Sequence, residues 1–323
     1  MESKSAIANR QSQIVERIER EAGVPDLVAI LAERLPPTDL QSLLLAVYHR
    51  RSSLRRPADV LSQYEADRFV RPAPVAPQRL LAWEQVAFAN LPAEFELLAL
   101  SPVCPLGTCA VVASVDPKWS VATIRNSEVV SDSTSVLALE CAVRRRVLLR
   151  DQPKSATPVH LAASHRLLRG QHYDSPLARA HFACFALCSA GRDQGNLRFE
   201  LAALRLHIGF YLRALRTFLG PAVPLRLSAT DWHTPVRTTL LEERVLSLGA
   251  EFAPVDGIVD DSRTSGRGYY HNLCFHIEAV DPAGRALELV DGGVVDWTQR
   301  LLSNAKERMV ISGIGSERLC AEF

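Results

Sequence analysis

The order of apolar runs in residues 78–323 restricts the fold more than any other feature of this sequence. Short strand-like runs there are separated by tight turns and by long helical segments. The two kinds of element do not alternate regularly, as they do in a doubly wound parallel sheet. We therefore expect an α+β fold, with a mainly antiparallel sheet flanked by helices.

Individual elements follow from apolar periodicity together with capping and turn residues. Helices are expected over residues 78–90, 133–146 and 196–219. Strands are expected over residues 95–100, 109–115, 120–124, 180–188, 271–280, 286–290 and 309–312. The sequence Asp281-Pro282-Ala283-Gly284 is typical of a tight turn and predicts a hairpin between two of these strands.

The chain before residue 78 has a different character. Residues 5–70 show the spacing of three or four amphipathic helices, and Pro57 suits the first turn of the last one. The prolines of residues 71–77 end any helix and make a stiff linker. We therefore expect a helical N-terminal domain with its Pro-rich linker over residues 1–77 and a second domain over residues 78–323.

Arginines between residues 50 and 71 make the N-terminal segment locally basic, which raises the possibility of a nucleic-acid arm. Acidic residues are interleaved at Asp59, Glu65 and Asp67, and no series of aromatic residues accompanies them. The pattern favours a solvated helix surface over a binding arm.

Composition sets broad limits on location and partners. The formal net charge of +1 gives no global attraction to nucleic acid or to a membrane surface. The chain start has no apolar signal-peptide core, and no apolar run is long enough to span a membrane. Seven scattered cysteines fit reduced core thiols, so we expect a cytoplasmic protein. Cys104, Cys109 and Cys274 are the alternative zinc ligands, but they lack the usual ligand spacing.

The C-terminal stretch combines glycines with an arginine. An apolar run ends at Ser312 and is followed by Gly313-Ile314-Gly315-Ser316-Glu317-Arg318. Glycines let the backbone approach a ligand closely, and an arginine at the start of a helix can hold a phosphate. The alternative is a tight strand-to-helix turn with Arg318 in solvent or paired with Glu317.

Two further stretches carry similar chemistry. Arg166 and Arg169 precede a polar loop and a strand, and this arginine-flanked hairpin would lay a basic surface over the sheet, suited to a nucleoside triphosphate. Residues 266–270, Gly-Arg-Gly-Tyr-Tyr, combine backbone freedom with a flat wall of hydroxyl donors.

In this order, the segments resemble the catalytic core of class II aminoacyl-tRNA synthetases. Within that family, the likeness is to the histidyl group and its paralogue, the regulatory subunit of ATP phosphoribosyltransferase. The helix 78–90 with the strand ending at Pro102 is similar to motif 1, residues 166–188 to motif 2, and residues 313–319 to motif 3. Residues 131–134 resemble the segment that holds the substrate amine, residues 266–270 the substrate loop, and residues 291–293 its following glycine turn.

The resemblance implies binding of ATP, with Mg²⁺, and of an amino acid, by a homodimer whose interface is motif 1. It implies that Arg166 and Arg318 clamp the ATP phosphates as catalytic residues, with Arg169, Gly313 and Gly315 also at the nucleotide. The substrate-binding residues that it implies, with weaker candidates included, are Asp132, Thr134, Arg179, His181, Arg267, Tyr269 and Tyr270. His172 and Arg263 are further candidates for ligand contact, and Asp132 is equally explained as a helix cap.

Several positions depart from the family pattern. Leu168 stands where motif 2 has a glutamate that contacts adenine, Ser265 where the histidyl group has a catalytic arginine, and Gly268 where it has an acidic residue. We also expect no anticodon-binding domain, so ordinary tRNA charging is not expected. Two functions remain open: an adenylate-forming ligase that transfers an amino acid or related carboxylate to a non-standard acceptor, and a non-catalytic regulator that senses an amino acid or nucleotide for a protein partner.

Overall fold

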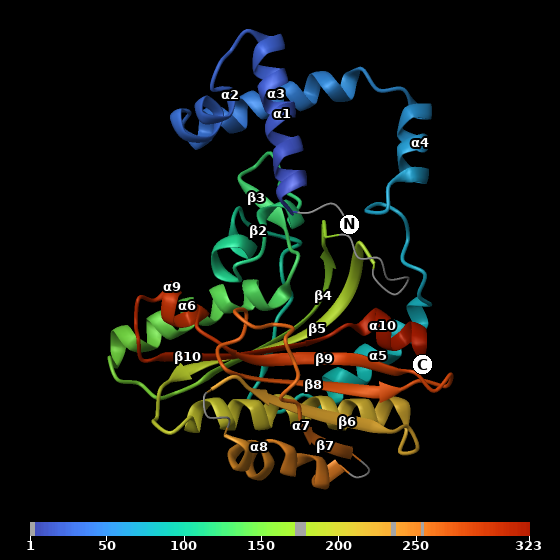
Figure 1. The fold of residues 1–323 in the computed structure, drawn as a ribbon, viewed down its shortest axis with the longest axis vertical. Helices are drawn as coiled ribbons and strands as arrows, with labels where there is room; N and C mark the ends of the chain where they lie inside the picture. The colour runs from blue at the N-terminus through green and yellow to red at the C-terminus, as the bar shows by residue number, and fades with distance from the viewer. Residues whose placement is uncertain (1–3, 172–178, 234–236, 253–254) are drawn as a thin grey trace. The chain divides into compact units, whose positions relative to one another are not determined.

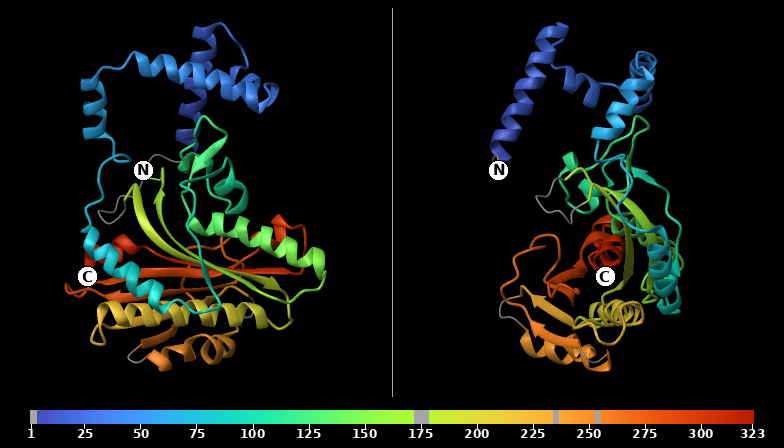
Figure 2. Two further views of the ribbon diagram at one scale, coloured as in Figure 1. Left: turned by 180° about the vertical axis from the view of Figure 1, so that it is seen from behind. Right: turned by 90° about the vertical axis from the view of Figure 1, so that its right-hand side faces the viewer.

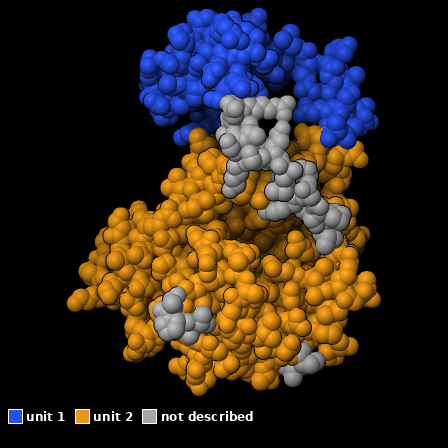
Figure 3. All heavy atoms as spheres, viewed as in Figure 1, with its two compact units in different colours: residues 1–66, 123–126 blue, residues 67–122, 127–323 orange. Residues whose placement is uncertain are grey.

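The computed structural model describes residues 4–171, 179–233, 237–252 and 255–323 (Figure 1). The chain forms two compact units (Figure 3). The first comprises residues 1–66 and 123–126, and the second comprises residues 67–122 and 127–323. Among the described residues, no helix has the length and apolar character needed to cross a membrane.

The first unit is helical, as the sequence predicts. Its elements are α1 (Lys4–Ala22), α2 (Leu27–Ala29), η1 (Ile30–Arg34), α3 (Pro37–Ser53) and α4 (Pro57–Ala66). Pro37 and Pro57 are the first residues of α3 and α4, where the missing N–H has no partner in the helix to lose. None of the side chains described between residues 11 and 66 is fully buried. Among these side chains, the unit therefore has no closed core.

The second unit is built on an eight-stranded sheet (Figure 1). In sheet order the strands are β1 (Glu96–Leu97), β4 (Val159–Leu168), β5 (His181–Arg192), β10 (Glu307–Ile314), β9 (Ala286–Val295), β8 (Leu273–Val280), β6 (Leu225–Asp231) and β7 (Val255–Val259). The β1–β4 and β6–β7 pairs are parallel and the other pairs are antiparallel. The mainly antiparallel sheet expected from the sequence is confirmed.

Helices cover both faces of this sheet. They are α5 (Pro77–Asn90), α6 (Ser133–Asp151), α7 (Arg198–Leu219), α8 (Thr238–Arg244), α9 (Trp297–Leu301) and α10 (Ser316–Glu322), with a 3₁₀ segment η4 (Leu246–Phe252). Along β5, Phe185 and Leu187 belong to the core under α7, whereas Ala186 and Cys188 belong to the core under α6. Because side chains alternate along a strand, these two cores lie on opposite faces. Helices α5 and α7 lie side by side (Figure 2), with the rings of Trp83 and Phe218 5.5 Å apart.

The expected strands at 109–115 and 120–124 are wrong, and the expected strand at 95–100 is reduced to β1. Residues Thr108–Val112 form a π-helical turn, η2, and Pro117–Trp119 a 3₁₀ turn, η3. A small separate sheet joins β2 (Val103–Pro105) to β3 (Ser127–Val129). The buried carboxylate of Glu128 accepts the N–H groups of Gly107 and Cys109 at 3.0 and 2.9 Å, which replaces ladder bonds. Val112 and Ala113, which suggested a strand, are buried beside α6 instead.

The glycine pair of β9 serves close packing within the sheet. The sequence-based expectation of a turn at residues 291–293 is wrong, because these residues lie inside β9. A Cβ atom on Gly292 would lie 2.5 Å from the Cβ of Ser312, and one on Gly293 would lie 2.6 Å from the carbonyl oxygen of Leu273. Positions 292 and 293 therefore require glycine because neighbouring atoms leave no space for a Cβ atom, and not because of an unusual backbone angle.

Two buried polar arrangements tie the sheet to its helices. Arg145 of α6 and Glu307 of β10 form a fully buried ion pair with two N···O distances of 2.8 Å. On the opposite face, Ser189 lies between His160 and His207 at 2.7 and 2.8 Å, and His207 also contacts the Ser312 hydroxyl at 2.7 Å. Burial lowers the pKa of His160 and places that of His207 well below its usual range.

Candidate functional site

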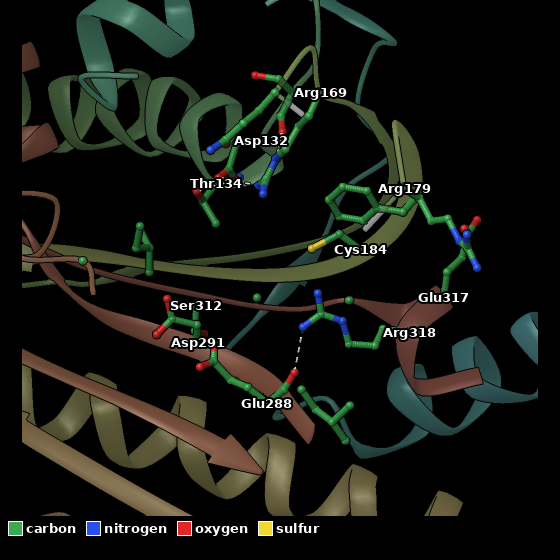
Figure 4. A pocket seen from close by; sticks show the side chains of 18 of the residues that line it. Asp132, Thr134, Arg169, Arg179, Cys184, Glu288, Asp291, Ser312, Glu317 and Arg318 are labelled. Atoms are coloured by element: carbon green, nitrogen blue, oxygen red, sulfur yellow. Dashed lines mark hydrogen bonds and ion pairs between the residues drawn. The ribbon is translucent and has the colours of Figure 1, made fainter. Parts of the chain in front are cut away.

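A cavity of about 710 Å³ opens in the second unit (Figure 4). Its walls come from the start of α6, the β4–β5 hairpin, β9, β10, α10 and the loop before β8. The sequence-predicted residues that line it are Asp132, Thr134, Arg169, Arg179, Tyr269, Tyr270, Gly313, Gly315 and Arg318. Arg166, His181 and Arg267 do not line it, and His172 lies outside the described residues. The fold thus brings most of the predicted site together.

One wall of the cavity is the N-terminus of α6. Asp132 is the N-cap residue, and its Oδ1 accepts the N–H and the hydroxyl of Thr134 at 2.9 and 2.7 Å. Arg169 donates to Asp132 Oδ2 at 3.3 Å and to the Ser131 carbonyl at 2.8 Å. The capping role of Asp132 is therefore present, and the residue also lines the cavity. Arg169 thus pairs with this carboxylate at the cavity wall.

The tyrosine loop forms a second wall. Arg263, with a side chain only 5% exposed, donates to Asp291 of β9 at 2.8 Å, and the Tyr270 hydroxyl donates to the same carboxylate at 2.9 Å. The Tyr269 ring packs edge-on against Trp297 with centroids 5.5 Å apart. Burial raises the pKa of both tyrosines well above the usual range, so the phenols are neutral donors. Arg263, a secondary candidate in the sequence, anchors this loop beneath the cavity wall.

Arg318 reaches the cavity from the first turn of α10. Its Nη1 donates to the carbonyl oxygen of Glu288 at 3.0 Å (Figure 4), and the residue is exposed. Arg179 lines the same cavity. With Arg169, three arginines therefore line the cavity among the described residues, and Gly313 and Gly315 line it as well.

Arg166 lies elsewhere. Its guanidinium forms an ion pair with the buried carboxylate of Glu317, and its Nη1 donates to His181 Nδ1 at 3.0 Å. It lines a second hollow of about 660 Å³ together with Leu168 and His181. Arg166 and Arg318 thus face different hollows in this structure. Arg267 is outside both hollows, with its guanidinium 5.8 Å from the ring centre of Trp232.

The sequence reasoning missed several residues that shape the site. Glu317 lines the cavity and pairs with Arg166 rather than with its neighbour Arg318. Pro74 and Val75, expected only as linker, form part of the cavity wall. An acidic residue beside Arg318 in the sequence could have indicated that Glu317 binds an arginine. Nothing in the composition of residues 71–77 indicated that this linker forms part of the cavity wall.

No metal centre is evident in the described part of the chain. No group of three or more histidine, cysteine, aspartate or glutamate side chains gathers there in a way that could hold an ion. The three cysteines considered as zinc ligands are free thiols. Cys109 Sγ lies 2.7 Å from the Ser131 hydroxyl, and Cys104 Sγ donates to the Glu128 carbonyl at 3.6 Å. Both thiols therefore have partners other than a metal.

Comparisons with known proteins give a likeness of structure alone. No protein-family model matches the sequence. No curated protein matches it either.

Among solved structures, the chain is similar to apo histidyl-tRNA synthetase from S. aureus, with 12% identity, a TM-score of 0.56, and coverage of 77% of this chain and 68% of that one. It is also similar to an ATP phosphoribosyltransferase regulatory subunit/histidyl-tRNA synthetase from Bacillus halodurans, with 13% identity, a TM-score of 0.57 and 83% coverage of each chain. A third similar structure is the RNA-binding domain of threonyl-tRNA synthetase from Cryptosporidium parvum, with 13% identity, a TM-score of 0.53, and coverage of 76% and 64%. The fold is therefore class II synthetase-like, as the motif order predicts.

Proposed function

We propose that the cavity binds ATP and an amino acid or a related carboxylate, and that it activates the carboxylate as an adenylate for a non-standard acceptor. The observation that carries this proposal is the gathering of Asp132, Tyr269 and Arg318 around one cavity from three distant parts of the chain. The cavity volume of about 710 Å³ suits ligands of this size.

Each wall would have a distinct role. The carboxylate of Asp132 would receive the substrate ammonium group, and the neutral hydroxyl of Tyr269 would contact polar substrate atoms. A substrate carboxylate oxygen attacks the α-phosphorus of ATP, a new P–O bond forms, and the bond to pyrophosphate breaks. Arg318 and Arg179 would stabilise the negative charge on the phosphates during this step.

Carboxylate oxygens are the ligands that Mg²⁺ prefers, and Glu288 and Asp291 are the two cavity carboxylates on β9. We propose that they would hold the Mg²⁺ that accompanies ATP. Asp291 already accepts hydrogen bonds from Arg263 and Tyr270, which fix its position for this role.

Amino-acid-dependent exchange between ATP and pyrophosphate tests the proposal. Arg318→Ala should reduce exchange by about 100-fold or more, because it removes a charge that stabilises the transition state. Arg205→Ala is the matched control, because Arg205 is exposed and pairs with Glu251 away from the cavity. The proposal fails if no carboxylate from a broad panel supports exchange and ATP binds equally well to the wild type and to Arg318→Ala.

The second candidate is a non-catalytic regulator that binds an amino acid or nucleotide and reports it to a partner enzyme. The position of Arg166 favours it, because this arginine is held by Glu317 and His181 rather than directed into the cavity. Affinity capture should then find a stable enzyme partner whose rate changes with ligand. A protein that stays alone and turns over ATP would refute this alternative.

A further inference from the structure

The proline-rich segment that follows the first unit is fastened to the β4–β5 hairpin. We call residues 67–77 the strap. Arg68 donates through Nη2 to the carbonyl oxygens of Gly170 and Gln171 at 2.9 and 3.4 Å. The Arg71 carbonyl oxygen lies 2.6 Å from His181 Nε2. The strap is thus held at two points by groups next to the cavity.

The two contacts of His181 fix its tautomer. The Arg71 carbonyl can only accept, so the Nε2 atom of His181 must carry the hydrogen. The Arg166 guanidinium can only donate, so the Nδ1 atom of His181 must accept. A neutral imidazole meets both requirements, whereas a protonated one would lose the bond from Arg166. His181 is therefore a bridge rather than a free ligand contact.

Arg166 extends this bridge to the cavity wall. It pairs with Glu317, whose side chain is 5% exposed and lines the cavity. Glu317 immediately precedes Arg318, which faces the proposed phosphate site. A continuous path of polar contacts thus runs from the Arg71 carbonyl through His181 and Arg166 to Glu317.

We propose that His181 is a positioning residue that couples the strap to Arg166 and, through Glu317, to the cavity. When Arg166 loses Glu317 as its partner, the bond to His181 weakens and the strap is held less tightly. The coupling itself rests on the contacts of His181 with Arg71 and Arg166 and on the ion pair of Arg166 with Glu317. Its response to a nucleotide rests on the proposed function, because phosphates in the cavity, which Glu317 lines and Arg166 does not, would have to draw Arg166 away from Glu317.

Trypsin cleavage after Arg68 reports the state of the strap. The protease can use this site only when the Arg68 side chain leaves Gly170 and Gln171, so the rate follows the open population when reclosing is fast. Cleavage after Arg55, between α3 and α4, provides an internal reference in the same sample. Mass spectrometry of the fragment that begins at Phe69 gives the rate.

Three variants define the expected pattern. His181→Ala should raise cleavage after Arg68 about fivefold relative to cleavage after Arg55, because the strap loses the hydrogen bond between the Arg71 carbonyl and His181. His181→Gln, which keeps one donor and one acceptor, should restore most of the protection. Glu317→Gln should raise cleavage about threefold without touching the strap, because it weakens a charge-assisted contact to Arg166.

Glu322→Gln is the matched control for Glu317→Gln. Glu322 is also on α10 but pairs with Arg285 rather than with Arg166, so this variant should leave cleavage after Arg68 unchanged. If Glu317→Gln lowers the melting temperature, Arg166→Gln replaces it, because it breaks the same path from the exposed side. The coupling is refuted if His181→Ala has no effect, or if Glu322→Gln accelerates cleavage as much as Glu317→Gln.

ATP provides the second arm of the experiment. Its binding is measured by calorimetry on the same samples that are digested. If ATP binds but cleavage after Arg68 stays constant, the response to the nucleotide is refuted and the proposed function stands. If ATP does not bind, the proposed function loses its basis, whereas the variants without ligand still decide whether His181 couples the strap to Glu317.

Discussion

Removing one partner of the buried ion pair between Arg145 and Glu307 should cost more stability than any surface change. Both side chains are 0% exposed. Arg145 also donates to the carbonyl oxygens of Thr157 and Ser155 at 2.6 and 3.1 Å, so its donors are well satisfied only in this arrangement. Glu307→Gln leaves a buried guanidinium without its counter-charge, and this should lower the free energy of unfolding by about 3–5 kcal/mol.

The pair also positions the candidate site. Asp132 caps the helix that carries Arg145, and Arg318 follows the strand that carries Glu307. Loss of the pair should therefore loosen two walls of the cavity together. Urea denaturation followed by tryptophan fluorescence measures the effect on stability, and ligand binding to the same variant measures the effect on the site.

An exposed pair provides the matched control. Arg205 and Glu251 are 55% and 50% exposed, so Glu251→Gln should cost no more than about 1 kcal/mol. The double variant Arg145→Met/Glu307→Leu should recover most of the stability lost in Glu307→Gln, because it leaves no buried charge unpaired. Equal costs for Glu307→Gln and Glu251→Gln would refute the reasoning.

Three further predictions follow from the same structure. Burial lowers the folded-state pKa of His160 and His207. Their contribution to stability is therefore complete above the unfolded pKa of about 6.5 and is lost as the pH falls below it. The free energy of unfolding should then fall by up to about 1.4 kcal/mol per pH unit for each group. Urea titrations from pH 7.5 to 5 should show this slope, and His207→Leu should reduce it by about one proton. Gly292→Ala should lower the free energy of unfolding by about 1–3 kcal/mol in the same assay, since its Cβ would lie 2.5 Å from that of Ser312, and an unchanged value would contradict the packing argument. The predicted homodimer should appear in light scattering and should dissociate in the variant Leu81→Glu. The reason is that Leu81 is 56% exposed on α5, the helix that resembles motif 1. A monomeric wild-type protein would exclude this interface.

Local patterns were enough to predict the class of fold and several of its elements. Helix 196–219 has an apolar face that its neighbours bury, and α7 begins only two residues later, at Arg198. The turn at residues 281–284 joins β8 to β9 as expected, because this turn chemistry is local. Segments 109–115 and 120–124 were misread. In the first, the side chain of Glu128 and the surface of α6 decide the structure rather than local propensity.

The sequence by itself determined the chemical groups of the site and their order along the chain. Residue type marked Tyr269 and Arg318, because glycine-flanked loops and strand-to-helix turns are local features. It marked Asp132 as a helix cap, and the resemblance to class II synthetases added this residue to the site. Only the tertiary structure decided which groups share a cavity. It paired Glu317 with Arg166 and fastened the strap to His181. These contacts join residues far apart in the chain, and a side chain's choice among several partners depends on packing that no local pattern encodes.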